Sequence, residues 1–277
     1  MIIRPSGRST DFISPSFGHG CLYNCSYCYM KRHKPEGLDV ATNIGDILTE
    51  INSHCAFADV DKPNQTHDEY ITYDISCNED FALHLKYYDW KRIFDFFRDH
   101  DRAMGSFATK YVNPALLEYN PEGKIRIRFS LMPQPYADQL EPNTSKIMHR
   151  IEAINDFIEA GYDVHINFSP VIVTEGWLTQ YRMLFEVVDS FVKPEHKDKV
   201  KAEVIFLTHN VNKHLYNLEN NLPGEELLWN SDIQEGKVSQ YGGLNIRYKH
   251  DLKAQYIKEW TELHDEIIPW NKIRYIF

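Results

Sequence analysis

The sequence alternates short β-strand-like runs with longer stretches that have the apolar spacing of amphipathic helices. Parallel strands need long crossover connections, which are usually helices, so this alternation predicts a parallel α/β sheet. Six strands in one chain favour a partial (β/α)6 barrel, whose active site lies at the carboxyl ends of its strands. The expected strands cover residues 13–17, 69–75, 103–109, 124–131, 163–169 and 203–208, and the expected helices 44–53, 90–97, 147–158 and 181–188.

The chain divides into three predicted parts. Residues 1–20 form a short N-terminal lead-in with the first strand, and residues 21–210 form the barrel. Residues 211–277 form a C-terminal extension, in which turn signals between about 220 and 243 predict a hairpin over the barrel mouth. Residues 272–277 are expected to form a final strand. Gly161 is expected to cap the C-terminal end of the helix over 147–158.

Two of the predicted strands carry polar residues on one face. Side chains of a strand alternate between its faces, so Arg126, Arg128 and Ser130 share the face opposite Ile125, Ile127 and Phe129. In the next strand His165, Asn167 and Ser169 alternate in the same way with apolar residues. Because helices cover the outside of a barrel, the polar sets should point inward. They would line a cavity for a charged cofactor, or else form a closed polar network.

Three cysteines follow the first predicted strand: Cys21, Cys25 and Cys28, with the spacing C-x3-C-x2-C. A [4Fe-4S] cluster takes four thiolates, so this motif would leave one iron open to a small molecule. A zinc site is an alternative, with His19 or His33 as a further ligand. A redox disulfide is another, although it gives no reason for a third cysteine.

Composition limits the class of protein. The chain has 277 residues, 43% of them hydrophobic, enough for one large domain with a full core. It shows neither a signal peptide nor an apolar run that could span a bilayer, so no membrane partner is expected. Five cysteines, an odd number, suit a reducing, cytoplasmic location. The net charge of −10 means that any contact with nucleic acid needs a local basic patch.

The cysteine spacing, with Tyr27 just before the third cysteine, resembles the radical S-adenosylmethionine (SAM) superfamily. From Cys21 to Phe277 the chain also resembles the spore photoproduct lyase family. The fragments that carry this resemblance are Cys-Ser-Tyr-Cys-Tyr-Met at 25–30, Thr-Tyr-Asp-Ile at 72–75, Ala-Thr-Lys at 108–110, Arg-Ile-Arg-Phe-Ser at 126–130, Glu-Pro-Asn-Thr at 141–144, Ala-Gly-Tyr at 160–162, Ser-Pro at 169–170, Glu-Gly-Trp at 175–177, Tyr-Gly-Gly at 241–243 and the terminal Arg-Tyr-Ile-Phe.

The resemblance implies a radical SAM barrel and an enzyme with lyase chemistry. SAM would be cleaved reductively to a 5′-deoxyadenosyl radical that abstracts hydrogen from a substrate, which in this family is a thymine dimer in DNA. The electron would come from a carrier such as flavodoxin or ferredoxin. The residue roles that it implies are cluster binding by Cys21, Cys25 and Cys28, SAM binding by Tyr27, Lys110 and Ser130, and catalysis by Tyr29 and Tyr241. Arg128 is a further candidate for SAM binding because it should point into the barrel, and Cys77 is a candidate catalytic residue in the loop at the barrel mouth.

Three departures concern the substrate and the last chemical step. The family's hydrogen-donating cysteine is expected at Ile71, so Cys77 would be a substitute donor or an inert packing residue. Gln240 replaces a basic residue before Tyr241, and only twenty residues precede the motif. The substrate is therefore expected to be a pyrimidine in nucleic acid, with a small metabolite or peptide as an alternative. A non-catalytic iron–sulfur or zinc module is a third hypothesis.

Overall fold

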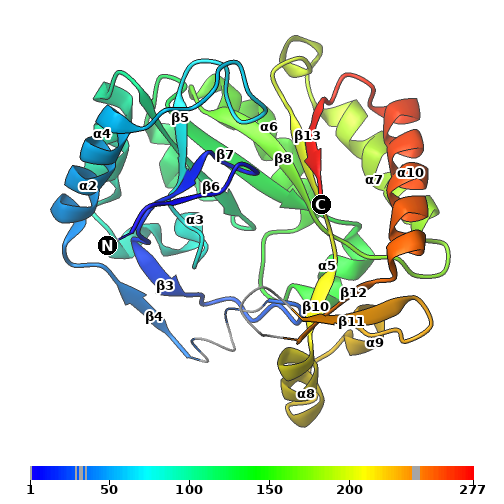
Figure 1. Cartoon of the computed structure of the whole chain (residues 1–277). Helices are drawn as coiled ribbons and strands as arrows, with labels where there is room; N and C mark the ends of the chain where they lie inside the picture. The colour runs from blue at the N-terminus through cyan, green and yellow to red at the C-terminus, as the bar shows by residue number, and fades with distance from the viewer. Residues whose placement is uncertain (1, 29, 31–33, 35, 239–243) are drawn as a thin grey trace.

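The computed structural model describes residues 2–28, 30, 34, 36–238 and 244–277. Its centre is a curved eight-stranded sheet with the order β1-β2-β5-β6-β7-β8-β9-β13 (Figure 1). Only the edge pair β1–β2 is antiparallel, and every other neighbouring pair in this sheet is parallel. The strands are β1 (Arg4–Pro5), β2 (Phe12–Ile13), β5 (Ile71–Asp74), β6 (Ala103–Thr109), β7 (Ile125–Leu131), β8 (Asp163–Val171), β9 (Ala202–Phe206) and β13 (Ile273–Ile276).

Helices cover the convex face of this sheet, with α2 and α4 on one flank and α7 and α10 on the other (Figure 1). The longer helices are α2 (Ile44–Phe57), α4 (Trp90–Asp99), α6 (Ile147–Glu159), α7 (Trp177–Phe191) and α10 (His250–Ile267). Gly161 follows the end of α6 as expected. Its φ of 96° is one that residues other than glycine rarely adopt. None of the described helices is long and apolar enough to cross a membrane.

Shorter elements surround the carboxyl ends of the strands. The helices here are α3 (Phe81–His84), α5 (Gln134–Leu140), α8 (Val211–Glu219) and α9 (Glu225–Leu228). The strands form two small sheets: β3 (Gly18–Gly20) pairs with β4 (Leu38–Val40), and β12 (Leu244–Tyr248) lies between β10 (Thr208–Asn210) and β11 (Gln234–Val238). The antiparallel β11–β12 pair is the expected hairpin, although its connecting residues 239–243 lie outside the described part.

The partial parallel barrel is confirmed, but the first predicted strand was placed wrongly. Residues 13–17 do not form one strand, since β2 stops at Ile13 and β3 begins at Gly18. Pro15 lies between them, and proline has no N–H for a sheet hydrogen bond. The prediction over 203–208 also joins two strands, β9 and β10, which belong to different sheets.

Ion pairs fill the amino-terminal part of the barrel interior. Arg126 donates to the Asp163 carboxylate at 2.6 Å and to the Thr66 carbonyl at 2.7 Å. His165 Nε2 lies 3.2 Å from Asp163, and burial lowers the pKa of His165 to about 3, so this imidazole is neutral at physiological pH. This layer is the closed polar network, and the cavity lies above it.

Glu203 joins the two edges of the sheet. Its carboxylate accepts hydrogen bonds from Arg128 at 3.4 Å and from Arg274 of β13. It also accepts from Ser9 at 2.8 Å and from Tyr275 at 3.0 Å. Ser9 lies between β1 and β2, at the opposite edge from Tyr275 of β13. One buried carboxylate therefore holds together the parts of the chain that the sheet alone leaves apart.

Glu203→Gln is expected to lower the free energy of unfolding by about 3–5 kcal/mol, because it leaves buried arginines without their counter-ion. Chemical denaturation of the anaerobic protein would measure this. Glu266→Gln is the matched control, since Glu266 pairs with Arg182 in an exposed ion pair that solvent screens. Equal unfolding midpoints for the two variants would contradict the role of Glu203.

The same comparison has a defined pH dependence. Burial favours the protonated form of Glu203, but Arg128 and Arg274 outweigh it and lower its pKa from 4.5 to about 2. A depressed carboxyl pKa stabilises the folded state above the unfolded pKa and loses that contribution as pH falls through the folded value. The difference between wild type and Glu203→Gln should therefore shrink between pH 4.5 and 2.

Candidate active site

A cavity of ≈ 310 Å³ lies at the carboxyl ends of β5 to β9. The strands contribute its floor and the cysteine loop contributes one wall. The residues that line it are Cys21, Tyr23, Cys25, Tyr27, Cys28, Met30, Asp74, Ser76, Cys77, Glu79, Asp80, Ala108, Thr109, Lys110, Arg128, Ser130, Asn167 and Ile205. All three motif cysteines and five further predicted site residues (Tyr27, Cys77, Lys110, Arg128 and Ser130) thus meet at one cavity.

The cysteine loop has little regular structure and is held by contacts to distant segments. Gly20, just before the first cysteine, has a φ of 108°, and a Cβ there would lie 2.7 Å from the Gly37 carbonyl. The Leu22 N–H donates to His84 Nε2 at 3.3 Å, and the Ser26 N–H donates to the Leu140 carbonyl at 2.9 Å. The loop conformation therefore depends on α3 and α5 as well as on its own sequence.

The environment of the sulfur atoms favours neutral thiols unless a cation is close. Burial, together with the Asp80 carboxylate, raises the pKa of Cys21 to about 12. Burial and the Glu141 carboxylate raise the pKa of Cys25 well above 9.0. Thiolate ligands at these positions thus need a strongly electrophilic partner, and iron provides one.

The spacing of the three sulfur atoms bears on the choice between a cluster and a single zinc ion. Ligand atoms of tetrahedral zinc lie about 3.8 Å apart when all are sulfur, given Zn–S bonds of about 2.3 Å. Among the described residues, one set of three metal-ligating side chains has its ligand atoms within 4.8 Å of one another, and it does not include these cysteines. At least two of the three sulfur atoms therefore lie more than 4.8 Å apart, farther than ligands of one tetrahedral zinc ion, and His33 lies outside the described residues.

Lys110 provides a positive charge at the cavity. Its backbone N–H donates to Asp80 Oδ2 at 2.8 Å, and Thr109 donates to Asp80 Oδ1 at 2.6 Å. Asp80 thereby fixes the end of β6. Burial favours the neutral amine, but Glu141 and Cys25 outweigh it and raise the pKa of Lys110. The ammonium group lies 4.0 Å from Glu141 and 5.7 Å from the centre of the Tyr27 ring.

A buried ion pair connects the cysteine loop to β7. The Tyr27 hydroxyl donates to one oxygen of Glu141, and Arg150 donates to the other at 2.8 Å. Arg150 also donates to the Ser130 carbonyl at 2.7 Å.

Sequence reasoning missed Asp80, Glu141 and Arg150. The signal for Asp80 was its position as an N-cap before Phe81.

The polar strand faces divide between the cavity and the network below it. Ser130, Arg128 and Asn167 line the cavity, and the Asn167 amide lies 3.5 Å from the Ser130 hydroxyl. Arg128 also donates to Asp74 at 2.8 Å, so its charge is already paired. Arg126 and His165 were expected either to line this cavity or to form a closed polar network, and they lie in the buried layer around Asp163.

The two candidate hydrogen-donor positions lie at opposite ends of β5. Ile71 begins this strand, is buried in the hydrophobic core and pairs with Ala103. Cys77 follows the strand's carboxyl end and lines the cavity, with its sulfur 4.0 Å from the Arg4 guanidinium. A thiol at position 71 would not face the cavity. Of these two positions, Cys77 is the one that lines the cavity, and its role as a hydrogen donor remains a prediction.

Two other predicted catalytic residues, Tyr29 and Tyr241, lie outside the described residues, as does Gln240. The structure places Met30 on the cavity wall directly after Tyr29. It also describes both strands on either side of the segment that contains Tyr241. The roles of both tyrosines remain predictions.

The family model for spore photoproduct lyase matches residues 3–277, nearly the whole chain. The chain belongs to the spore photoproduct lyase family. It is 27% identical over 276 residues to spore photoproduct lyase of Bacillus subtilis, which covers 98% of this chain and 77% of that protein. It is 25% identical over 248 residues to spore photoproduct lyase of Clostridium acetobutylicum, which covers 87% of this chain and 69% of that protein.

Solved structures of spore photoproduct lyase have the same fold. One, complexed with dinucleoside spore photoproduct, superposes with a TM-score of 0.87 at 21% identity over 100% of this chain and 79% of that one. A more distant neighbour, native anSMEcpe with bound AdoMet, superposes with a TM-score of 0.53 at 12% identity. The match covers 95% of this chain and 63% of that one. The predicted barrel and the membership of the radical SAM class are confirmed, and this spore photoproduct lyase-like chain is an enzyme of that class.

Proposed function

We propose that this spore photoproduct lyase family member repairs a thymine photoproduct in DNA, with SAM and a [4Fe-4S] cluster as cofactors. The observation that carries this proposal is the single cavity shared by the cysteine motif, Lys110, Ser130 and Cys77. The family membership and the curated relatives named spore photoproduct lyase support the substrate class.

The cluster would be held by Cys21, Cys25 and Cys28. When bound with SAM, it supplies the electron that cleaves SAM to methionine and a 5′-deoxyadenosyl radical. That electron would come from a carrier such as flavodoxin or ferredoxin. All three cysteines line the wall of the cavity, so they would hold the cluster beside the residues proposed to bind SAM.

Four residues of the chain would bind and orient SAM. Lys110 keeps its charge in the cavity, so it can pair with the SAM carboxylate. Ser130 offers a hydroxyl beside the Asn167 amide. Tyr27, fixed by its hydrogen bond to Glu141, would pack near the adenine. Arg128 would act mainly by shaping the floor, since Asp74 and Glu203 already pair its guanidinium.

Cys77 would return a hydrogen atom to the repaired base. The S–H bond breaks, a C–H bond forms on the substrate radical, and the unpaired electron stays on sulfur. This step needs a thiol and not a thiolate. Burial, together with the Asp74 carboxylate, raises the pKa of Cys77 above 9.0, although Arg4 and Arg128 oppose the shift. Cys77 therefore keeps its proton at physiological pH. Tyr29 would relay the radical back to the cofactor and Tyr241 would face the substrate, as the family resemblance implies.

The cofactor assignment predicts iron content. Anaerobically reconstituted wild-type protein should hold four iron and four sulfide per chain, as a [4Fe-4S] cluster requires. Cys21→Ala, Cys25→Ala and Cys28→Ala should each lose most of the iron, because two thiolates do not retain the cluster. Cys77→Ala is the matched control: it lines the same cavity but should keep its iron. Iron content that is insensitive to the motif would contradict the assignment.

The function itself is tested by incubating the reduced protein with SAM and dinucleoside spore photoproduct. We expect 5′-deoxyadenosine to form and the lesion to revert to two thymines, both measured by chromatography. Formation of 5′-deoxyadenosine without any loss of the lesion would reject the substrate but keep the enzyme class. Absence of both products from cluster-loaded protein would reject the class-specific chemistry at this cavity.

Cys77→Ser tests the hydrogen donor separately. A serine O–H bond is too strong to give a hydrogen atom readily, whereas the cavity shape is nearly unchanged. Cleavage of SAM should continue, while the yield of repaired thymine per 5′-deoxyadenosine should fall by at least about tenfold, equivalent to 1.4 kcal/mol in the partition between products. An unchanged ratio would show that another group returns the hydrogen. Cys55→Ser, on α2 behind the sheet, controls for the general loss of a thiol.

A further inference from the structure

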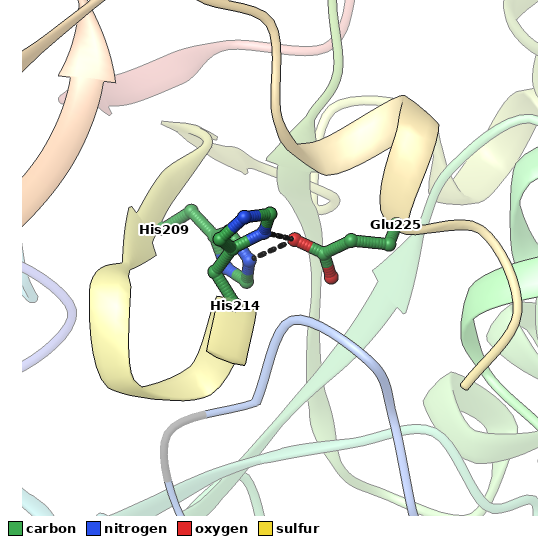
Figure 2. A group of neighbouring side chains, drawn as sticks. All are labelled: His209, His214 and Glu225. Atoms are coloured by element: carbon green, nitrogen blue, oxygen red, sulfur yellow. Dashed lines mark hydrogen bonds and ion pairs between the residues drawn. The ribbon is translucent and has the colours of Figure 1, made fainter. Parts of the chain in front are cut away.

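A second group of metal-ligating side chains lies apart from the cysteine cavity. Its members are His209 on β10, His214 on α8 and Glu225 at the first position of α9 (Figure 2). His209 Nε2 lies 2.9 Å and His214 Nδ1 lies 2.5 Å from the same carboxylate oxygen, Glu225 Oε1. All three ligand atoms lie within 4.8 Å of one another.

Neighbouring side chains fix the orientation of this group. The His214 ring stacks on Trp229, with 3.8 Å between ring centres and 12° between planes. The Asn217 amide donates to the second oxygen of Glu225, so Oε1 is the oxygen left for the two imidazoles. His209 is 1% exposed and Glu225 is 8% exposed. Such second contacts, which set the direction of a ligand, are typical of metal sites.

The donor set is chemically suited to a zinc-like ion. Two imidazoles that bind a metal in their neutral form and one carboxylate give a donor set of net charge −1. Zinc binds imidazole nitrogen and carboxylate oxygen at about 2.0–2.2 Å, which sets their separation in a tetrahedral site at about 3.3–3.4 Å. From the hydrogen-bond distances of 2.9 and 2.5 Å seen here, the imidazole nitrogens would need to move away from Glu225 Oε1 by about 0.4–0.9 Å.

We propose that His209 Nε2, His214 Nδ1 and the Glu225 carboxylate bind one divalent transition-metal ion of the zinc class, with a water molecule in the fourth position. This ion is separate from the cluster and shares no ligand with it. Its effect would nevertheless reach the cysteine motif. The Asn217 amide that holds Glu225 also donates to the Ser26 carbonyl at 2.8 Å, between Cys25 and Cys28. The ion would therefore fix the C-terminal elements against the cysteine loop.

The metal content of the purified protein tests this proposal. Wild type purified with zinc in the medium should contain one equivalent of zinc beyond its iron. The triple variant Cys21→Ala/Cys25→Ala/Cys28→Ala should keep this equivalent while it loses the iron. After removal of zinc by a chelator, Co²⁺ added to the triple variant should produce visible d–d bands. No thiolate of the motif remains in this variant, so these bands would come from cobalt at the proposed site.

Substitutions then locate the ion. Glu225→Gln and His209→Ala should abolish the zinc equivalent and the cobalt bands, and Asn217→Ala should weaken cobalt binding about 10–100-fold. His250→Ala is the control, since His250 is exposed and its ring lies 3.2 Å from Asp251. If the wild type contained no zinc and the triple variant gave no cobalt bands, the proposal would be overturned. The three side chains would then be a hydrogen-bonded group without a metal. Zinc that is lost only with the cysteines would overturn it as well.

Discussion

The buried carboxylate of Glu203 is the interaction on which the barrel depends. The parallel sheet is open, and its two edges lie at β1 and β13. Glu203 accepts hydrogen bonds from Ser9 near the first edge and from Arg274 and Tyr275 at the second. It also pairs with Arg128 on a central strand. Since the removal of one partner from a buried ion pair costs more than the pair itself contributes, these groups must all be present together.

This closed polar layer determines where the cavity can be. Arg126 and Asp163 occupy the interior near the amino ends of the strands, so only the carboxyl ends leave space. Arg128 belongs to both regions, because it pairs with Asp74 and Glu203 and also lines the cavity floor. The charge of the floor is therefore nearly neutralised. Lys110, at the end of β6, is the cation whose position leaves it available to an anionic ligand group.

Strand parity predicted correctly which residues face inward, but parity has no information on depth. Arg126 and Arg128 differ by one step along the same face, yet only the second reaches the cavity. The two positions considered for the hydrogen donor also differ in depth. Ile71, where the family's cysteine is expected, begins its strand in the core, whereas Cys77 beyond the opposite end of that strand lines the cavity. The lengths of the intervening loops cannot be read from periodicity.

The contacts of the cysteine loop explain why the fragments that resemble the family are scattered along the chain. Tyr27 depends on Glu141, and Glu141 depends on Arg150. The Ser26 N–H donates a hydrogen bond to the Leu140 carbonyl, and the Ser26 carbonyl accepts one from the Asn217 amide. A loop with little secondary structure of its own keeps its geometry only if these distant partners are kept. A substitution at Asn217 or Glu141 should thus disturb the cysteine motif more than its distance in sequence suggests, whereas exposed residues between these positions can vary freely.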